Sequence, residues 1–332
     1  MVTIKDIALK TGVSIAAVSK ALNHLPGISA EKAKEILDTA EKMGYFPNTA
    51  ARMLKTNRSY NIGIVYENRL AHEYFSQVLE AVRNETSAKG YDLTFLSSEG
   101  SNDGYYEHAM RRQCDGIIVA QGNFDKAELD RLAASTLPLV AIDQQFDGHT
   151  EIVNDNVGST EDIVKYLHEM GHERIGYIHG EDGEVTRQRL TGFYNGCAKY
   201  GIKVPKKYVI AAKFQEPKDS GLATRRLLAL KDRPTCIIYP DDISYLGGLT
   251  EMEHQHLSIP DDCSCVGYDG IRLSRLLRPN LATYHQNAEE IGRRAAEELI
   301  KQIEHPQNYK VDTYVIKGNV QPGATVKDLA VK

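Results

Sequence analysis

The sequence lacks the long apolar runs and the leader that membrane and secreted proteins carry. No stretch of about 18 consecutive apolar residues is present, so we expect no membrane span. The first residues, Met1 to Asp6, contain no apolar core of a secretory signal peptide. Together these absences favour a cytoplasmic protein over a periplasmic or membrane-bound one.

Cysteine is also scarce, which limits redox and metal chemistry. The sequence has five cysteines, an odd number, and no two of them are spaced C-x-x-C. Cys263 and Cys265 have no second cysteine or histidine pair at a matching distance, so a metal site is not expected. Most of the cysteines lie in apolar runs typical of strands, which predicts reduced core residues. The cysteines are Cys114, Cys197, Cys236, Cys263 and Cys265.

Signatures of the common enzyme classes are missing as well. The sequence contains no P-loop, no G-x-G-x-x-G after an apolar run, no H-E-x-x-H and no G-x-S-x-G. Asp241 and Asp242 follow the apolar run 236–240, but no acid–base partner is near them in sequence. We interpret them as binding or capping groups, with Asp242 as the capping one. We therefore expect no catalytic residue and no cofactor, which argues against a hydrolase or a kinase.

Length and charge indicate more than one domain. The 332 residues exceed one typical domain, and a hydrophobic fraction of 42% is enough for a large core. In residues 1–59, nine lysines and arginines oppose five acidic residues, an excess of four positive charges. Because the formal net charge of the whole chain is −5, residues 60–332 carry a net charge of −9. A small basic head on an acidic body suggests that the head meets a polyanion, although so modest an excess also arises by chance.

Residues 3–23, TIKDIALKTGVSIAAVSKALN, have the layout of two short helices separated by a turn. Thr3 and Asp6 form a start like a capping box, and Gly12 readily takes a positive φ. Ser14 is a good N-cap for a second helix that runs to about Leu22. This arrangement predicts a helix-turn-helix, whose second helix lies in the major groove of DNA.

A third helix and a candidate DNA-reading face complete the predicted head. Ser29 caps the third helix, apolar residues recur along it at helical spacing, and Gly44 ends it. On the second helix, Lys20 can reach guanine or a phosphate, and Ile15 can pack on a thymine methyl. The alternative is an ordinary solvent face. The candidate contacts on this helix are Ser14, Ile15, Ala16, Ser19, Lys20 and Asn23.

The segment FPNTAARMLKTNRS, residues 46–59, follows the head. Pro47 suits a helix start, and residues 49–54 are compatible with a helix too short to be stable alone in water. A segment that orders only when docked would couple two domains. A plain interdomain linker is the alternative. The candidate DNA contacts in this segment are Asn48, Ala51, Leu54 and Lys55.

From residue 60 onward, short apolar runs alternate with helical segments. Buried runs of this kind imply parallel strands covered by helices, and two similar series imply two lobes. In open α/β sheets ligands bind beyond the carboxyl ends of strands, so we expect a ligand site between the lobes. The predicted strands are residues 61–66, 91–97, 114–120, 137–143, 174–180, 208–214, 236–240 and 263–269. The predicted helices include residues 74–89, 157–170, 187–200 and 287–304.

Polar groups at strand ends are the candidates for this ligand site. Asp143, Asp241 and Asp269 each follow an apolar run, and Arg189 begins the segment RLTGF. Carboxylates accept several hydrogen bonds and arginine donates in a fork, which suits the hydroxyl groups of a sugar. Phe75, or the tyrosine before it, could stack on a sugar face, and a core position for Phe75 is an equal alternative. Few basic residues converge there, which disfavours a phosphorylated sugar.

Four segments together resemble the LacI/GalR family of bacterial transcription regulators, over essentially the whole chain. They are VSIAAVSKALN, MGYFPNTAARMLKTNRS, RLTGF and CVGYDG. The resemblance implies a hinge helix that folds on operator DNA, with Leu54 wedged into the minor groove at the centre of a palindrome. It also implies that Ile15 and Ala16 read bases and that Arg189 contacts the effector.

This sequence departs from the family pattern at three of these positions. Ala17 stands where the family commonly has a threonine. Lys20 replaces the usual arginine, which removes bidentate geometry and softens the preference for guanine. Asp241 stands where several relatives carry asparagine, which adds a negative charge to the ligand site.

The resemblance also implies a domain order and a mechanism. We expect a small all-α helix-turn-helix domain, residues 1–46, a hinge, residues 47–59, and a two-lobed α/β body with parallel sheets, residues 60–332, like a periplasmic binding protein. The expected function is a cytoplasmic repressor that binds operator DNA as a homodimer and is released by a sugar or glycoside. The alternative is a free-standing sugar-binding protein without a DNA function. The lobes would comprise about 60–157 with 288–316 and about 158–287 with 317–332.

Overall fold

The computed structural model divides into two compact units, Met1–Ser59 and Tyr60–Lys332. Each unit has a hydrophobic core of its own. The predictions for Asn23, Asn48, Ala51, Leu54 and Lys55 lie outside the described residues. The structure describes residues 2–22, 25–45, 53, 58–66, 72–96, 104–121, 126–144 and 146–331.

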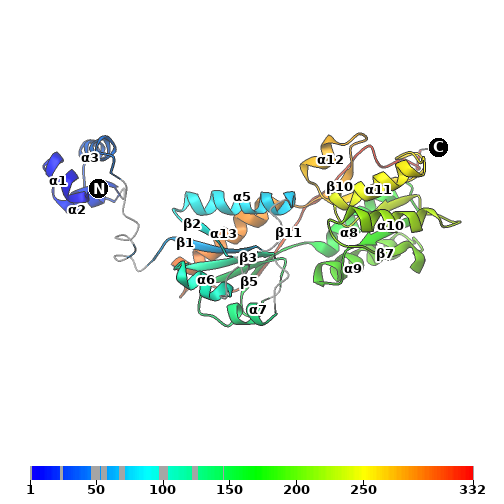
Figure 1. Ribbon diagram of the computed structural model, residues 1–332, viewed down its shortest axis with the longest axis horizontal. Helices are drawn as coiled ribbons and strands as arrows, with labels where there is room; N and C mark the ends of the chain where they lie inside the picture. Colours follow the sequence, from blue (N-terminus) through cyan, green and yellow to red (C-terminus); the bar gives the residue numbers. More distant parts are fainter. Residues whose placement is uncertain are drawn as a thin grey trace. The chain divides into compact units, whose positions relative to one another are not determined.

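The described part of the first unit forms three helices, α1 (Ile4–Thr11), α2 (Ile15–Leu22) and α3 (Ala30–Lys42) (Figure 1). The predicted capping box is present, because the Thr3 side chain accepts from the Asp6 N–H while the Asp6 carboxylate accepts from the Thr3 N–H. The turn between α1 and α2 begins at Gly12, whose φ of 65° is left-handed.

One fully buried aliphatic side chain from each helix forms the centre of this unit: Ile7, Val18 and Ile36. Alanines on the same faces, Ala21 and Ala40 among them, are buried with these three and let the helices approach closely. Because α2 packs through Val18 and Ala21, its opposite face is directed away from this core. The predicted helix-turn-helix fold is thereby confirmed.

The second unit contains two six-stranded sheets, one in each lobe. The first sheet has the order β11-β5-β4-β3-β1-β2, and the second has the equivalent order β12-β10-β9-β8-β6-β7. Neighbouring strands pair in parallel except for β10 and β12, which are antiparallel. The first sheet comprises β1 (Asn61–Tyr66), β2 (Asp92–Leu96), β3 (Gly116–Gln121), β4 (Leu139–Ile142), β5 (Thr150–Asn154) and β11 (Thr313–Ile316). The second comprises β6 (Ile175–His179), β7 (Val209–Ala211), β8 (Cys236–Ile238), β9 (Ser264–Asp269), β10 (Ala282–His285) and β12 (Asn319–Gln321).

Helices cover both faces of each sheet, so each lobe has three layers (Figure 1). In the first lobe, α5 (Glu73–Ala88) and α13 (Ala288–Glu304) pack on one face, with α6 (Tyr105–Arg111) and α7 (Lys126–Ala133) on the other. In the second lobe the helices are α8 (Asn156–Glu169), α9 (Glu184–Lys199), α10 (Pro217–Leu228), α11 (Asp242–His254) and the short α12 (Arg272–Leu276). Of these, α8 and α9 share one face, and α10 and α11 share the other.

Along the described chain, the polypeptide passes between the two sheets between β5 and α8, between β10 and α13, and between β11 and β12. The lobes are therefore joined by three separate crossings of the described chain rather than by a single linker. Such connections form a hinge, about which two lobes open and close.

Four strands were not predicted from the sequence: β5, β10, β11 and β12. Along β5, buried and half-buried residues alternate, and along β11 exposed and half-buried residues alternate. These are short edge or near-edge strands, which lack the continuous apolar run that marks a fully buried strand.

All five cysteines are free and buried, as predicted. Burial raises the pKa of Cys114 to about 11, which leaves its thiol protonated and unreactive at neutral pH. No helix in the described residues combines the length and the hydropathy needed to cross a membrane.

Candidate effector cleft and nucleic-acid interface

A cleft of about 1460 Å³ lies between the two lobes, at the carboxyl ends of the central strands of both sheets. Its walls include the residues that follow β4 in the first lobe and those that follow β8 and β9 in the second. Because parallel strands end at the same edge of a sheet, residues far apart in sequence meet there. All five predicted effector residues line this cleft: Phe75, Asp143, Arg189, Asp241 and Asp269.

Arg189, on α9, is held rigidly at the base of the cleft and is only 7% exposed. Its Nε donates to Asn156 Oδ1 at 3.0 Å, and its Nη1 donates to the Pro240 carbonyl at 3.2 Å. The guanidinium carbon lies 3.5 Å from the centroid of the Tyr268 ring, a cation–π contact. Nη2 makes no hydrogen bond with a described residue, so it remains available to a ligand.

Asp143 and Asp269 bring one carboxylate from each lobe into the cleft. Oδ1 of Asp143 accepts from the Asn154 N–H at 2.9 Å, and Oδ1 of Asp269 accepts from Gln286 Nε2 at 2.6 Å. The second oxygen of each carboxylate accepts no hydrogen bond from a described residue. Both residues have a positive φ, 52° for Asp143 and 103° for Asp269, which is uncommon for residues other than glycine. Backbone strain of this kind concentrates at functional sites.

Asp241, rather than Asp242, is the capping residue, and it also lines the cleft. Asp241 is the N-cap of α11: Oδ1 accepts from the Ser244 N–H at 2.7 Å, and Oδ2 accepts from the Gln215 N–H at 2.8 Å. Asp242, expected to be the capping residue, is fully buried and accepts from the Thr283 hydroxyl and the Ile271 N–H. The prediction for Asp242 was wrong, because α11 begins at Asp242 itself, one residue earlier than a cap at that position requires.

Burial in this region raises the pKa of several carboxyl groups. It raises the pKa of Asp242 to about 8. It also raises the pKa of Asp269 well above its usual range, and the neighbouring Asp241 and Asp242 act in the same direction. The pKa of Asp143 is raised by burial as well. Carboxyl groups that are difficult to ionise in a cleft are typical of ligand sites.

The cleft also contains Tyr74, which the sequence analysis named as an alternative to Phe75, and Thr186 and Phe214, which it did not select. The buried hydroxyl groups of Tyr74 and Thr186 have no hydrogen-bond partner, although both residues line the cleft. Phe75 packs against Tyr66, with ring centroids 5.9 Å apart, so it belongs to the core and to the cleft wall together. Phe214 also lines the cleft, beside Arg189. No sequence signal marks Thr186 or Phe214, because a threonine or phenylalanine equally suits a core position.

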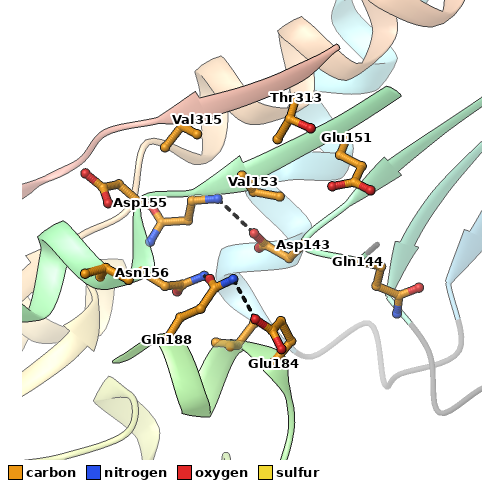
Figure 2. Close-up of a pocket in the computed structure, with 13 residues that line it drawn as sticks. Asp143, Gln144, Glu151, Val153, Asp155, Asn156, Glu184, Gln188, Thr313 and Val315 are labelled. Carbon is orange, nitrogen blue, oxygen red and sulfur yellow. Dashed lines mark hydrogen bonds between the residues drawn. The ribbon is translucent and has the colours of Figure 1, made fainter. Parts of the chain in front are cut away.

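A smaller hollow of about 300 Å³ adjoins the cleft on the side of β5 and β11 (Figure 2). Asp143 and Glu184 line both spaces, whereas Gln188 lines only the smaller one and Arg189 only the cleft. The start of α9 therefore separates the two. Figure 2 shows the Asn154–Asp143 hydrogen bond and the bond of 3.0 Å from Gln188 Nε2 to Glu184 Oε1 at this boundary.

The face of α2 opposite the core is the candidate DNA interface. Ile15 is 49% exposed, and Ser14, Ala16 and Lys20 are exposed with it, whereas Ser19 is half-buried. An exposed isoleucine beside an exposed lysine provides the apolar and cationic groups that contact bases and phosphates in a major groove.

Comparisons with known proteins identify the family. Residues 3–48 match the model described as bacterial regulatory proteins, lacI family, and residues 164–326 match a periplasmic binding protein-like domain. The HTH-type transcriptional repressor PurR of Mannheimia succiniciproducens is 31% identical over 99% of this chain and 100% of its own length. The chain belongs to the LacI family. A second relative in the LacI family, the probable HTH-type transcriptional repressor ExuR of Bacillus subtilis, is 31% identical over 92% of this chain and 93% of its own.

Solved structures of LacI-type regulators share the fold. The lac repressor dimer bound to operator and the anti-inducer ONPF has a TM-score of 0.78 at 22% identity, over 98% of this chain and 99% of that one. The complex of the transcriptional regulator CelR with cellobiose has a TM-score of 0.71 at 19% identity, over 98% and 100%. As a LacI-family member, the chain is a DNA-binding transcriptional regulator with an effector-binding body, and it is not an enzyme.

Proposed function

We propose that this LacI-family regulator is a cytoplasmic repressor whose affinity for a palindromic operator is lowered by a sugar or glycoside bound between its lobes. The observation that carries the proposal is the meeting of Asp143 from one lobe with Arg189 and Asp269 from the other at one cleft. A ligand held by both lobes stabilises their closed arrangement. Its effect on DNA binding equals its differential affinity for the two arrangements.

The proposed DNA contacts form two groups, in a head of residues 1–46 and a hinge of residues 47–59. In a homodimer, each head reads one half-site through α2. Ile15 and Ala16 contact base edges and Lys20 contacts guanine or a phosphate, while Ser14, Ser19 and Asn23 approach the backbone. The hinge segments meet over the centre of the palindrome. The proposed hinge contacts are Asn48, Ala51, Leu54 and Lys55.

The proposed effector contacts combine one fixed donor with acceptors on both sides. Arg189 Nη2 donates to a ligand hydroxyl, and the unengaged oxygens of Asp143 and Asp269 accept from others. Phe75 supplies an apolar wall on which a sugar face packs. Asp241 acts by holding Gln215 and the start of α11 at the cleft edge.

The DNA half of the proposal is tested at Leu54. A leucine wedged between base pairs acts only at the centre of a specific site, where it kinks the duplex. Leu54→Ala is expected to weaken binding to a selected palindromic operator at least about tenfold and to leave binding to random DNA nearly unchanged. Fluorescence anisotropy at one fixed salt concentration measures both affinities. Equal losses on the two DNAs would contradict the wedge.

The effector half is tested at Asp269, with Asp92→Asn as a control that removes a carboxylate from an exposed position on β2, outside the cleft lining. Asp269→Ala is expected to remove the effect of ligand on operator binding while operator affinity without ligand stays within about threefold of wild type. Asp92→Asn is expected to retain the full response. An unchanged response in Asp269→Ala would place the effector elsewhere.

A further inference from the structure

The charged side chains around the cleft are almost all of one sign. Among the described residues that line it, nine are acidic and Arg189 is the one lysine or arginine. Arg187 lies outside the lining and pairs with Asp182 at 2.9 Å and with Glu184 at 3.1 Å, which leaves most of this excess uncompensated. The nine are Asp130, Asp143, Asp147, Glu181, Asp182, Glu184, Glu216, Asp241 and Asp269.

The hollow beside the cleft is also lined by acidic side chains (Figure 2). Its lining adds Glu151 and Asp155 to the acidic set, and no lysine, arginine or histidine belongs to the described residues that line it. One face of the cleft therefore continues into a second acidic surface. A low-dielectric cleft lined by one sign of charge raises the local concentration of ligands of the opposite sign.

Arg189 alone does not balance the carboxylates at the base of the cleft. Its Nε and Nη1 already donate to Asn156 and to the Pro240 carbonyl, and its plane is stacked on Tyr268. The free oxygens of Asp143 and Asp269 remain without a hydrogen bond from a described residue. A buried carboxylate is costly to ionise unless it is paired or accepts hydrogen bonds, so a cationic ligand group beside these two oxygens would offset that cost.

Asp143 and Asp269 line the same cleft as Tyr74, although the two aspartates belong to different lobes. Burial raises the pKa of the Tyr74 hydroxyl well above its usual range, and the charges of Asp143 and Asp269 raise it further. That hydroxyl is buried and has no partner. A ligand in this cleft is therefore lined by one carboxylate from each lobe and by an unpaired hydroxyl group.

We propose that the effector carries an ammonium group that bridges Asp143 and Asp269, and that the effector is an amino sugar with a free amine. The inference rests on the proposed function, in which the cleft binds a sugar. An ammonium group has three N–H donors and a positive charge, so it can donate to both free carboxylate oxygens at once. A sugar hydroxyl has one hydrogen to donate. A uronate or a phosphate would add negative charge to a cleft that already has an excess of it.

The test compares matched sugars on the full-length protein by isothermal titration calorimetry at neutral pH. The probes are the glucose and galactose series, each with the neutral hexose, the 2-amino sugar, its N-acetyl derivative and the uronate. In at least one series, the amino sugar is expected to bind at least about tenfold more tightly than the neutral hexose. N-acetylation removes the charge and keeps the nitrogen, so it is expected to abolish this advantage.

Conservative variants separate charge from shape. Asp143→Asn is expected to reduce the ratio of amino-sugar to neutral-sugar affinity to near one, whereas Asp92→Asn is expected to keep the wild-type ratio. A neutral hexose or a uronate that binds as tightly as the amino sugar would overturn the ammonium proposal and leave the sugar-responsive function standing. If no member of either series binds, the sugar assignment and the ammonium proposal both fail.

Discussion

At the scale of single residues, the cleft is lined by side chains that use only part of their hydrogen-bonding capacity within the protein. Arg189 donates two hydrogen bonds to the protein, from Nε and Nη1, and Nη2 donates none to a described residue. Asp143 and Asp269 each have one carboxylate oxygen that accepts no hydrogen bond from a described residue. Internal bonds fix the orientation of each group, so little conformational entropy is lost when a ligand arrives. Preorganised groups of this kind give specificity, because a ligand that lacks the matching group leaves a buried polar atom unpaired.

Lys20 lies on the proposed DNA-reading face, where the resemblance to the family led us to expect an arginine. A lysine presents one flexible point charge, whereas an arginine matches guanine O6 and N7 with two parallel donors. Lys20→Arg is expected to sharpen the preference for guanine at the contacted position by about 1 kcal/mol, or roughly fivefold. Selection from a randomised operator library, followed by sequencing, measures the change. An unaltered base preference would show that Lys20 contacts the phosphate backbone instead.

Residue roles could be predicted from the sequence where a local rule applied. Thr3 with Asp6, Gly12 and Ser29 follow capping and turn chemistry, and each acts as predicted. The assignment for Asp242 failed because capping depends on where α11 begins, which differs by one residue from our expectation. Thr186 was missed because its position in the cleft is created by the packing of the two lobes, which no local pattern encodes.

At the scale of elements, the second lobe depends on a close crossing of α8 and α9. Gly192 lies at this crossing, where an added Cβ would be 2.1 Å from the Val157 carbonyl oxygen. Gly196, one turn later, would place a Cβ 2.9 Å from Val164 Cβ. Two glycines one turn apart therefore let α9, which carries Arg189, pack directly on α8, which begins at the hinge.

Gly192→Ala tests this crossing. The added methyl group would force α9 away from α8, and overpacking of this kind costs about 1 to 3 kcal/mol of unfolding free energy. Because α9 carries Arg189, effector affinity is expected to fall with stability. Urea unfolding measures the stability change, and Thr191→Ala, at an exposed position on the same helix, is the control expected to stay within about 0.5 kcal/mol. Equal stability of Gly192→Ala and wild type would mean that the crossing is looser than the structure indicates.

The central strands of both sheets and the edge strands β2 and β7 were predictable, whereas β5, β10, β11 and β12, at or next to the opposite edges, were not. The runs at 61–66 and 263–269 are rich in apolar residues, and they form β1 and β9 close to the expected bounds. By contrast, β12 has three residues, and it is a strand because β10 supplies its antiparallel partner. Pairing between residues near 284 and 320 is a long-range event that composition does not encode.

At the scale of the whole molecule, the acidic body makes stability depend on pH. Asp242 is fully buried beneath the cleft, close to Asp241 and Asp269, and burial raises its pKa to about 8. Because its pKa is higher in the folded than in the unfolded state, folding retains a proton that the unfolded chain releases. This stabilising contribution is complete below the unfolded pKa of 3.8 and is lost as the pH rises through 8.

We therefore expect the unfolding free energy to fall between pH 6.5 and 8, by up to about 1.4 kcal/mol per pH unit from this group. Burial lowers the pKa of His72 to about 4. This histidine makes the unfolding free energy rise with pH, but only below about pH 6.5. Asp242→Asn is expected to reduce the slope in this window and to leave the part that Asp269 contributes, whereas Asp92→Asn is expected to keep the wild-type slope. Urea unfolding at several pH values measures the profile. A wild-type stability that rises with pH across this window would contradict the buried protonated carboxyl.

The central claim is that a ligand in the cleft between the lobes controls operator binding by the whole protein. The most direct measurement is an anisotropy titration of the full-length protein on a selected palindromic operator, with and without a sugar shown by calorimetry to bind. The account predicts that two protomers bind one palindrome and that saturating sugar weakens this binding at least about tenfold, a coupling of roughly 1.4 kcal/mol. Unchanged operator affinity with the sugar bound would contradict it.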